Sequence, residues 1–78
     1  MVSSASNPID LHIGQRTQLA RVLAGIELEE LATALCISPQ QMRAYELGER
    51  MSASTLFLIA KIVRKPISYF FDSLFLGG

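Results

Sequence analysis

The chain has 78 residues, half of them hydrophobic, and its seven basic side chains balance seven acidic ones to a net charge of zero. This length makes one small domain, and zero net charge argues against strong non-specific affinity for nucleic acid, for which a basic domain is expected. One cysteine and one histidine exclude an internal disulfide and a metal cluster, so no metal and no cofactor are expected. A chain without disulfides is expected in the reducing cytoplasm. We find no signal peptide and no apolar run near the ~20 residues of a membrane span, so no membrane association is expected.

The first part of the chain predicts an arm followed by a helix. Residues 1–8 are rich in serine and end in Asn-Pro, a composition typical of a flexible N-terminal arm. Asp10 is expected to cap a first helix that runs to about Ala24, and Gly25 is expected to stop it.

A second helix is expected from about Glu27 to Cys36. Three glutamates crowd its first turn, where the helix dipole favours negative charge. Four apolar residues recur at the spacing of one helical face and are expected to be buried: Leu28, Leu31, Ala32 and Leu35.

The stretch from Ser38 to Gly48 predicts a short third helix with clear start and stop signals. Ser38 suits the N-cap, Pro39 suits the first helical position, and Gly48 suits the left-handed residue after the helix end. Met42 and Tyr45 are three residues apart, so they form one narrow apolar stripe that faces inward.

The outward face of this third helix is expected to carry Gln40, Gln41 and Arg43. Glutamine and arginine side chains make paired hydrogen bonds to adenine and guanine edges in the major groove of DNA. The segment Cys36-Ile37-Ser38 joins the second and third helices, and a turn this tight imposes a sharp angle. That is the geometry of a helix-turn-helix, whose second helix enters the major groove.

The last third of the chain predicts two more helices. Ser52 or Ser54 is expected to cap a fourth helix that ends at about Val63, before Arg64-Lys65-Pro66 breaks it. A short fifth helix is expected from Tyr69 to about Leu74. The residues expected in the core of this part are Leu56, Phe57, Ile59, Ala60, Val63, Phe70 and Phe71.

No segment alternates in the manner of a strand, and no repeat or low-complexity segment occurs. The sequence therefore predicts a compact all-α domain of five helices over residues 9–76, with residues 77–78 as a C-terminal tail.

These helices resemble the phage repressor and Cro-like helix-turn-helix domain of the XRE type, a lambda-repressor-like fold. The matching motifs are Gly14-Gln15-Arg16, Gly25-Ile26, Glu29-Glu30-Leu31-Ala32, Tyr45-Glu46-Leu47-Gly48 and Leu56-x-x-Ile59-Ala60. A subgroup of bacterial transcriptional regulators is similar in Asn7-Pro-Ile-Asp-Leu-His-Ile-Gly14, Gln40-Gln41-x-x-x-Tyr45-Glu46, and Ser52-Ala-Ser54 with Pro66-x-Ser68-Tyr-Phe-Phe71.

The resemblance implies a homodimer that binds a roughly palindromic operator in double-stranded DNA and controls transcription. The residues that it places nearest the bases are Gln40, Gln41, Arg43 and Ala44, and those near phosphates are Arg16, Ser38 and Arg50. It places the dimer contacts in the C-terminal half. The apolar residues there that we expect to form the dimer interface are Leu58, Ile62, Phe70, Leu74 and Phe75.

The chain also departs from the family pattern. Leu28 and Leu47 stand where a glutamine and a basic residue usually meet DNA, and Gln18 and Ala20 stand where the subgroup often has arginine. Each phosphate contact that is lost removes the release of about one counterion, and this lowers the affinity for DNA. Cys36 replaces a glycine, so a positive φ there would be strained. The family pattern would expose four positions that are apolar in this chain: Leu28, Leu47, Met51 and Leu58.

Two functions follow from these observations. The first is a sequence-specific DNA-binding transcriptional regulator, expected to be a repressor, that acts as a homodimer with its third helix in the major groove. The alternative is a protein-interaction and dimerisation module that has the same fold and weakened DNA binding. An enzyme is not expected, because the sequence offers no nucleophile–base pair, metal cluster or phosphate loop. No small-molecule ligand is expected.

Overall fold

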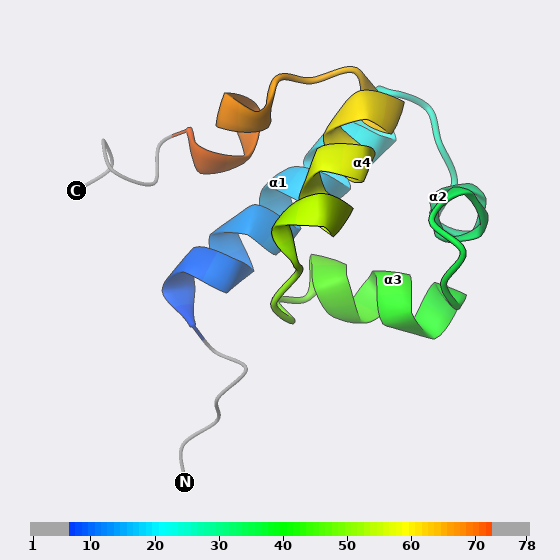
Figure 1. The fold of residues 1–78 in the computed structure, drawn as a ribbon, viewed down its shortest axis with the longest axis horizontal. Coiled ribbons are helices and arrows are strands. Elements are labelled where there is room, and N and C mark those ends of the chain that lie inside the picture. The colour runs from blue at the N-terminus through cyan, green and yellow to red at the C-terminus, as the bar shows by residue number, and fades with distance from the viewer. Residues whose placement is uncertain (1–6, 73–78) are drawn as a thin grey trace, which may run out of the picture.

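The computed structural model describes residues 7–72, which form helices only. The elements are α1 (Pro8–Leu23), α2 (Leu28–Ala34), α3 (Pro39–Glu46), α4 (Ala53–Val63) and a short 3-10 helix, η2 (Ile67–Phe71). Helix α1 is central, because α3, α4 and η2 all pack against it, while α2 packs on α3 (Figure 1). The predicted all-α class is confirmed within residues 7–72.

The start of α1 differs from the prediction. Asn7, not Asp10, is the N-cap, and its side-chain oxygen accepts hydrogen bonds from the backbone N–H of Ile9 at 2.8 Å and of Asp10 at 3.3 Å. Pro8 then takes the first helical position, where its missing N–H costs nothing. The helix therefore begins inside the segment predicted as an arm, of which residues 1–6 lie outside the described residues.

The other N-caps follow the sequence more closely. Ser38 Oγ accepts from the backbone N–H of Gln41 at 3.0 Å, as predicted for α3. Ser52, rather than Ser54, caps α4 by accepting from the N–H of Thr55 at 3.2 Å. Such caps satisfy N–H groups that have no partner within the helix.

The fifth helix differs in type and position. A 3-10 helix runs over Ile67–Phe71, where the sequence predicted a helix from Tyr69 to about Leu74. The helical segment between Pro66 and Asp72 is only five residues long. Short helical segments often form the tighter i→i+3 hydrogen bonds of a 3-10 helix. Leu74 lies outside the described residues.

All four α-helices end in the same backbone arrangement, with a left-handed residue and a hydrogen bond that spans six residues. Glycine takes the left-handed position after α1 and α3, at Gly25 with φ 73° and Gly48 with φ 116°. Cys36 with φ 60° and Arg64 with φ 61° take it after α2 and α4. The strained positive φ considered for Cys36 is therefore present, and α2 ends at Ala34, two residues earlier than predicted.

The core collects one face of each helix. Its buried apolar residues are Ala20, Leu28, Leu31, Ala32, Met42, Leu56, Ile59, Ala60, Val63 and Phe70. The predicted stripes of α2 and α4 are thus inside, with Leu35 partly buried. Thr17 is also buried, and its hydroxyl donates to the carbonyl of Ile13 at 2.8 Å.

One prediction of burial was wrong. Phe57 is 57% exposed, because its neighbour Leu56 belongs to the core stripe of α4 and the next residue points about 100° away around the helix. Leu28 stands at a position that the family pattern would expose, but it is buried, as the spacing of the α2 stripe predicted, because α2 turns its first apolar residue toward α3. Leu47 and Leu58 are exposed as expected, at 69% and 51%, and Met51 is partly buried.

Helices α1 and α3 approach each other closely at Gly14. A Cβ atom at this position would lie 2.5 Å from the carbonyl oxygen of Tyr45 and 2.8 Å from that of Glu46. Any side chain would therefore push α1 away from the end of α3.

We predict that Gly14→Ala lowers the free energy of unfolding by about 2 kcal/mol, a typical cost of overpacking. The added methyl group meets backbone rather than a flexible side chain, so the clash outweighs the better helix propensity of alanine. Urea denaturation followed by circular dichroism measures this. The control is Gln15→Ala, at an exposed position of the same helix, which should not destabilise. Equal stability of both variants would contradict the close approach.

We predict that Cys36→Gly raises the free energy of unfolding by about 0.5 to 1 kcal/mol, because glycine adopts a left-handed conformation without the strain of a Cβ. Ala34→Gly, two residues earlier and still helical, should lower it, since glycine costs up to about 1 kcal/mol in a helix. Thermal unfolding of the two variants, compared with the parent, should show opposite shifts; shifts of the same sign would argue against strain at Cys36.

Candidate nucleic-acid interface

Helices α2 and α3 form a compact pair joined by four residues, from Leu35 to Ser38. The left-handed Cys36 reverses the chain, and Ile37 N–H closes the turn by donating to the carbonyl of Ala32 at 3.0 Å. In Figure 1, α2 is seen nearly end-on while α3 runs across the view, so the helices cross at a steep angle. Helix α2 thus packs behind α3, and the outer face of α3 is exposed.

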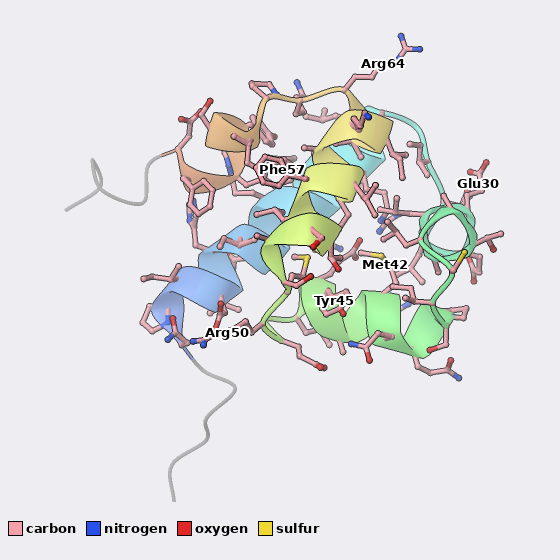
Figure 2. The ribbon with its side chains drawn as sticks, in the orientation of Figure 1. Glu30, Met42, Tyr45, Arg50, Phe57 and Arg64 are labelled. Carbon is pink, nitrogen blue, oxygen red and sulfur yellow. The ribbon has the colours of Figure 1, made fainter. Side chains whose placement is uncertain are left out.

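The inner face of α3 is anchored in the core. Met42 is fully buried and Tyr45 is partly buried against the core cluster. Figure 2 shows Met42 directed from α3 into the space between α4 and α2. Gln40 and Arg43 are exposed on the other side, and Ala44 is partly exposed. The structure therefore brings Gln40, Arg43 and Ala44 together on one side of the helix.

Gln41 departs from the predicted outward face. Its side chain is partly buried, and its amide nitrogen is buried with no hydrogen-bond partner among the described residues. Position 41 lies four residues before the partly buried Tyr45, on the same side of the helix, so its side chain is turned toward the molecule rather than outward.

A buried ion pair fixes the far end of α3 and was not predicted from the sequence. Arg21 of α1 donates from Nε to Glu46 Oε2 at 2.6 Å and from Nη2 to Glu46 Oε1 at 3.3 Å. Its Nη1 donates to the carbonyl of Ile26 at 2.9 Å. Only 11% of the Arg21 side chain and 4% of the Glu46 side chain are exposed. Through these contacts Arg21 links α1 to α3 and to the connection that precedes α2.

The sequence did hold one signal for this pair. A glutamate in the last turn of a helix is unfavourable, because the helix C-terminus carries partial negative charge. Glu46 occupies such a position in α3, which indicates that a cation compensates it.

Arg16, predicted near a phosphate, is held by η2 instead. Its Nε donates to the carbonyl of Tyr69 at 3.0 Å, and its guanidinium carbon lies 4.1 Å from the centre of the Tyr69 ring. Its Nη2 lies 3.6 Å from Asp72 Oδ2. His12 Nε2 lies 2.8 Å from the Asp72 carbonyl. These contacts attach η2 to α1.

The other two predicted phosphate contacts lie differently. Arg50 is 75% exposed on its side chain, and its Nε lies 3.2 Å from Asp10 Oδ2. Figure 2 places Arg50 beside the beginning of α1. Ser38 is exposed at the start of α3, and its hydroxyl oxygen already accepts the capping hydrogen bond.

The predicted dimer residues do not share one surface. Phe70 is fully buried in the core, so it cannot contact a partner and that prediction is wrong: η2 presents it inward, against α1 and α4. Leu58 is exposed and Ile62 is partly exposed on α4. Leu74 and Phe75 lie outside the described residues.

This arrangement, two short helices at a steep angle with the second presenting a polar face, is a helix-turn-helix. A family profile described as "Helix-turn-helix" matches residues 18–70. The chain belongs to this family, and the resemblance to Cro/C1-type domains inferred from its motifs is confirmed.

Several bacterial proteins are similar over the same length. An "Uncharacterized HTH-type transcriptional regulator" of Sinorhizobium medicae is 43% identical over 67 residues, which are 85% of this chain and 48% of that protein. An "Uncharacterized transcriptional regulator in ATPase CF(0) region" of Rhodospirillum rubrum is also 43% identical over 67 residues, 85% of this chain and 62% of that protein. The chain therefore spans about half the length of the curated relatives it matches.

Among residues 7–72, no helix has the length and apolar character needed to cross a bilayer. The same residues contain no group of three or more acidic, histidine or cysteine side chains placed to hold a metal ion.

We predict that Glu46→Gln lowers the free energy of unfolding by about 3 kcal/mol, because it leaves the buried charge of Arg21 without its partner. Glu49→Gln, at an exposed position three residues on, is the matched control and should change little. Replacing both partners, as Arg21→Met with Glu46→Leu, should recover much of the stability, since no charge is then buried. Chemical denaturation of the four proteins gives the comparison; a double variant as weak as the single one would contradict this reading.

Proposed function

We propose that this chain is a sequence-specific DNA-binding domain that regulates transcription in the bacterial cytoplasm. The observation that carries the proposal is the open face of α3. Gln40 and Arg43 are exposed on a helix that Ser38 caps, Met42 anchors and the Arg21–Glu46 pair holds in place. Both side chains suit paired hydrogen bonds to purine edges, and a rigidly mounted helix positions them for the groove.

The DNA backbone contacts would be few. The largely exposed Arg50 is the cation best placed for a phosphate, whereas Arg16 would first have to leave Tyr69 and Asp72. Arg50 would exchange Asp10 for a phosphate. We therefore expect a shallow dependence of affinity on salt, because each phosphate contact contributes a slope of about −0.9 in log affinity against log salt.

A homodimer would compensate for weak binding by each copy. Two copies would place their α3 helices in successive major grooves about 34 Å apart. The exposed Leu58 and the partly exposed Ile62 of α4 supply apolar surface for the dimer. Bound in this way, the dimer would act as a repressor by blocking access of RNA polymerase to the operator.

A second candidate function rests on Leu47. This leucine is 69% exposed at the end of α3, next to the proposed reading face. A large apolar side chain there suits a protein partner better than a phosphate. In this alternative the domain keeps the fold and binds another protein or a second copy, with weak DNA affinity.

The test begins with duplexes selected from a random pool by the parent chain, and measures their affinity by fluorescence anisotropy at two salt concentrations. We predict that Arg43→Ala weakens binding to the selected duplex about tenfold, within the 1–3 kcal/mol of one bidentate base contact. Arg64→Ala is the matched control, because Arg64 projects from the end of the molecule opposite α3 (Figure 2). It should bind like the parent.

Three results would decide against the proposal. They are failure of the pool to enrich, affinity that does not respond to salt, and equal effects of the two arginine variants. Sedimentation at the same protein concentrations, with and without DNA, separates the two candidates. An oligomer whose formation ignores added duplex, in a chain that enriches no sequence, would favour the protein-interaction module.

A further inference from the structure

An apolar groove of about 380 Å³ opens between the first half of α1, the start of α4 and η2. Ser52 and Ala53 form part of its lining. Figure 2 shows Phe57 directed from α4 toward η2, so its exposed ring forms one wall of the groove. The large apolar side chains of the lining are Ile13, Met51, Leu56, Phe57, Ile67 and Phe71.

The chemistry of this lining selects an apolar occupant. Among the described residues that form the groove, none carries a charged side chain, and the single hydroxyl is that of Ser52. This hydroxyl is already used within α4, because it accepts from the N–H of Thr55 at 3.2 Å and donates to Thr55 Oγ1 at 3.0 Å. Small-molecule sites usually add a few polar groups that orient the ligand. Side chains that offer apolar contact only are better suited to the hydrocarbon side chains of a peptide.

The volume of the groove fits more than one side chain. A cavity of about 150 Å³ is large enough to hold a benzene ring. A groove of about 380 Å³ therefore has room for a phenyl ring together with an adjoining aliphatic side chain. The expected occupant is a short peptide segment with an aromatic residue next to aliphatic ones.

The chain itself has such a segment directly after the groove. Residues 74–76 are Leu-Phe-Leu, and they begin three positions after Phe71, one of the wall residues. The point at which the chain leaves η2 is attached to α1, because His12 Nε2 lies 2.8 Å from the carbonyl oxygen of Asp72. His12 is next in sequence to Ile13, another wall residue. The apolar segment 74–76 thus starts from the edge of the groove.

The connection is short enough to favour an occupant from the same chain. Phe75 follows Asp72 by three residues, a span of at most about 10 Å in extended chain. A group tethered by so short a linker has an effective concentration in the millimolar range, above that of a second copy in dilute solution. We infer that Leu74-Phe75-Leu76 folds back into the groove of its own chain, with the Phe75 ring packed against Phe57.

This contact changes the surface that is available to a second copy. Leu74-Phe75, expected at the dimer interface from the sequence, is used within one chain, which leaves Leu58 and Ile62 of α4 for the partner. The segment also covers Met51, the neighbour of Arg50 in the loop between α3 and α4, and holds this loop against α1. The inference goes beyond the proposed function and does not depend on DNA binding.

The first experiment is a pair of double-mutant cycles in the full chain, measured by urea denaturation. Phe57→Ser and Phe75→Ser should each lower the equilibrium constant for folding. The loss in the double variant should be at least about threefold smaller than the product of the single losses, because residues in contact are coupled. Leu58→Ser is the matched control, since Leu58 follows Phe57 on α4, is similarly exposed (51% against 57%) and does not line the groove. Its effect and that of Phe75→Ser should multiply.

A fluorescent reporter locates the segment. The chain contains no tryptophan, so Phe75→Trp introduces a single indole. Its emission should be blue-shifted relative to the urea-unfolded chain, and acrylamide should quench it less than the indole of Leu47→Trp, at a largely exposed position outside the groove. Adding Phe57→Ser should abolish this protection, and adding Leu58→Ser should preserve it.

Docking within one chain requires that the blue shift and the coupling do not change with protein concentration. A blue shift that grows with concentration would assign the groove to the segment of a second copy and overturn the inference. An indole at position 75 as accessible to acrylamide as that of Leu47→Trp would also overturn it, as would equal coupling of Phe75 to Phe57 and to Leu58. The selected duplexes test DNA binding separately, so failure of either proposal leaves the other untouched.

Discussion

The position of α3 depends on its junction with α1. Gly14 lets the backbones meet at a distance that no side chain would permit, and Arg21 and Glu46 form a buried, forked ion pair beside it. A buried pair of this kind adds little net stability compared with apolar residues of the same size, but any shift that separates its members leaves a charge unpaired in the interior. The junction therefore fixes one arrangement of α3 relative to the rest of the domain.

The helix ends show how much strain this small domain carries. Four helices stop with the same hydrogen bonds, yet only two of the left-handed residues are glycines. Cys36 and Arg64 adopt the same left-handed conformation, although it brings their Cβ atoms too close to the backbone. At Cys36 the strain lies in the turn of the helix-turn-helix, where the reversal of the chain aims α3. The architecture is thus maintained by packing of Leu31, Met42 and Ile59 rather than by turn residues of ideal type.

The surface around α3 is mixed rather than basic. Arg16 and Arg50 are both paired within the chain, with Tyr69 and Asp72 in one case and with Asp10 in the other. Leu28 and Leu47 are apolar at positions where the family has a glutamine and a basic residue, and Glu29 adds a negative charge nearby. In the proposed DNA complex, a domain with this surface would rely less on the phosphate backbone for affinity. It would depend more on base edges and on a second copy, which fits a chain of zero net charge.

The sequence by itself determined the class of fold, the helix-turn-helix and most of the buried stripes, because these follow from local spacing and from caps such as Ser38 and Pro39. Two predictions failed by a few positions. Asn7 rather than Asp10 caps α1, and Leu56 rather than Phe57 is buried in the core. Only the tertiary structure decided that Arg21 meets Glu46, that Arg16 is held by η2, and that Phe70 is inside. The two arginine contacts join residues 25 and 53 positions apart, and periodicity within one helix carries no information about which side chains of another helix it will meet.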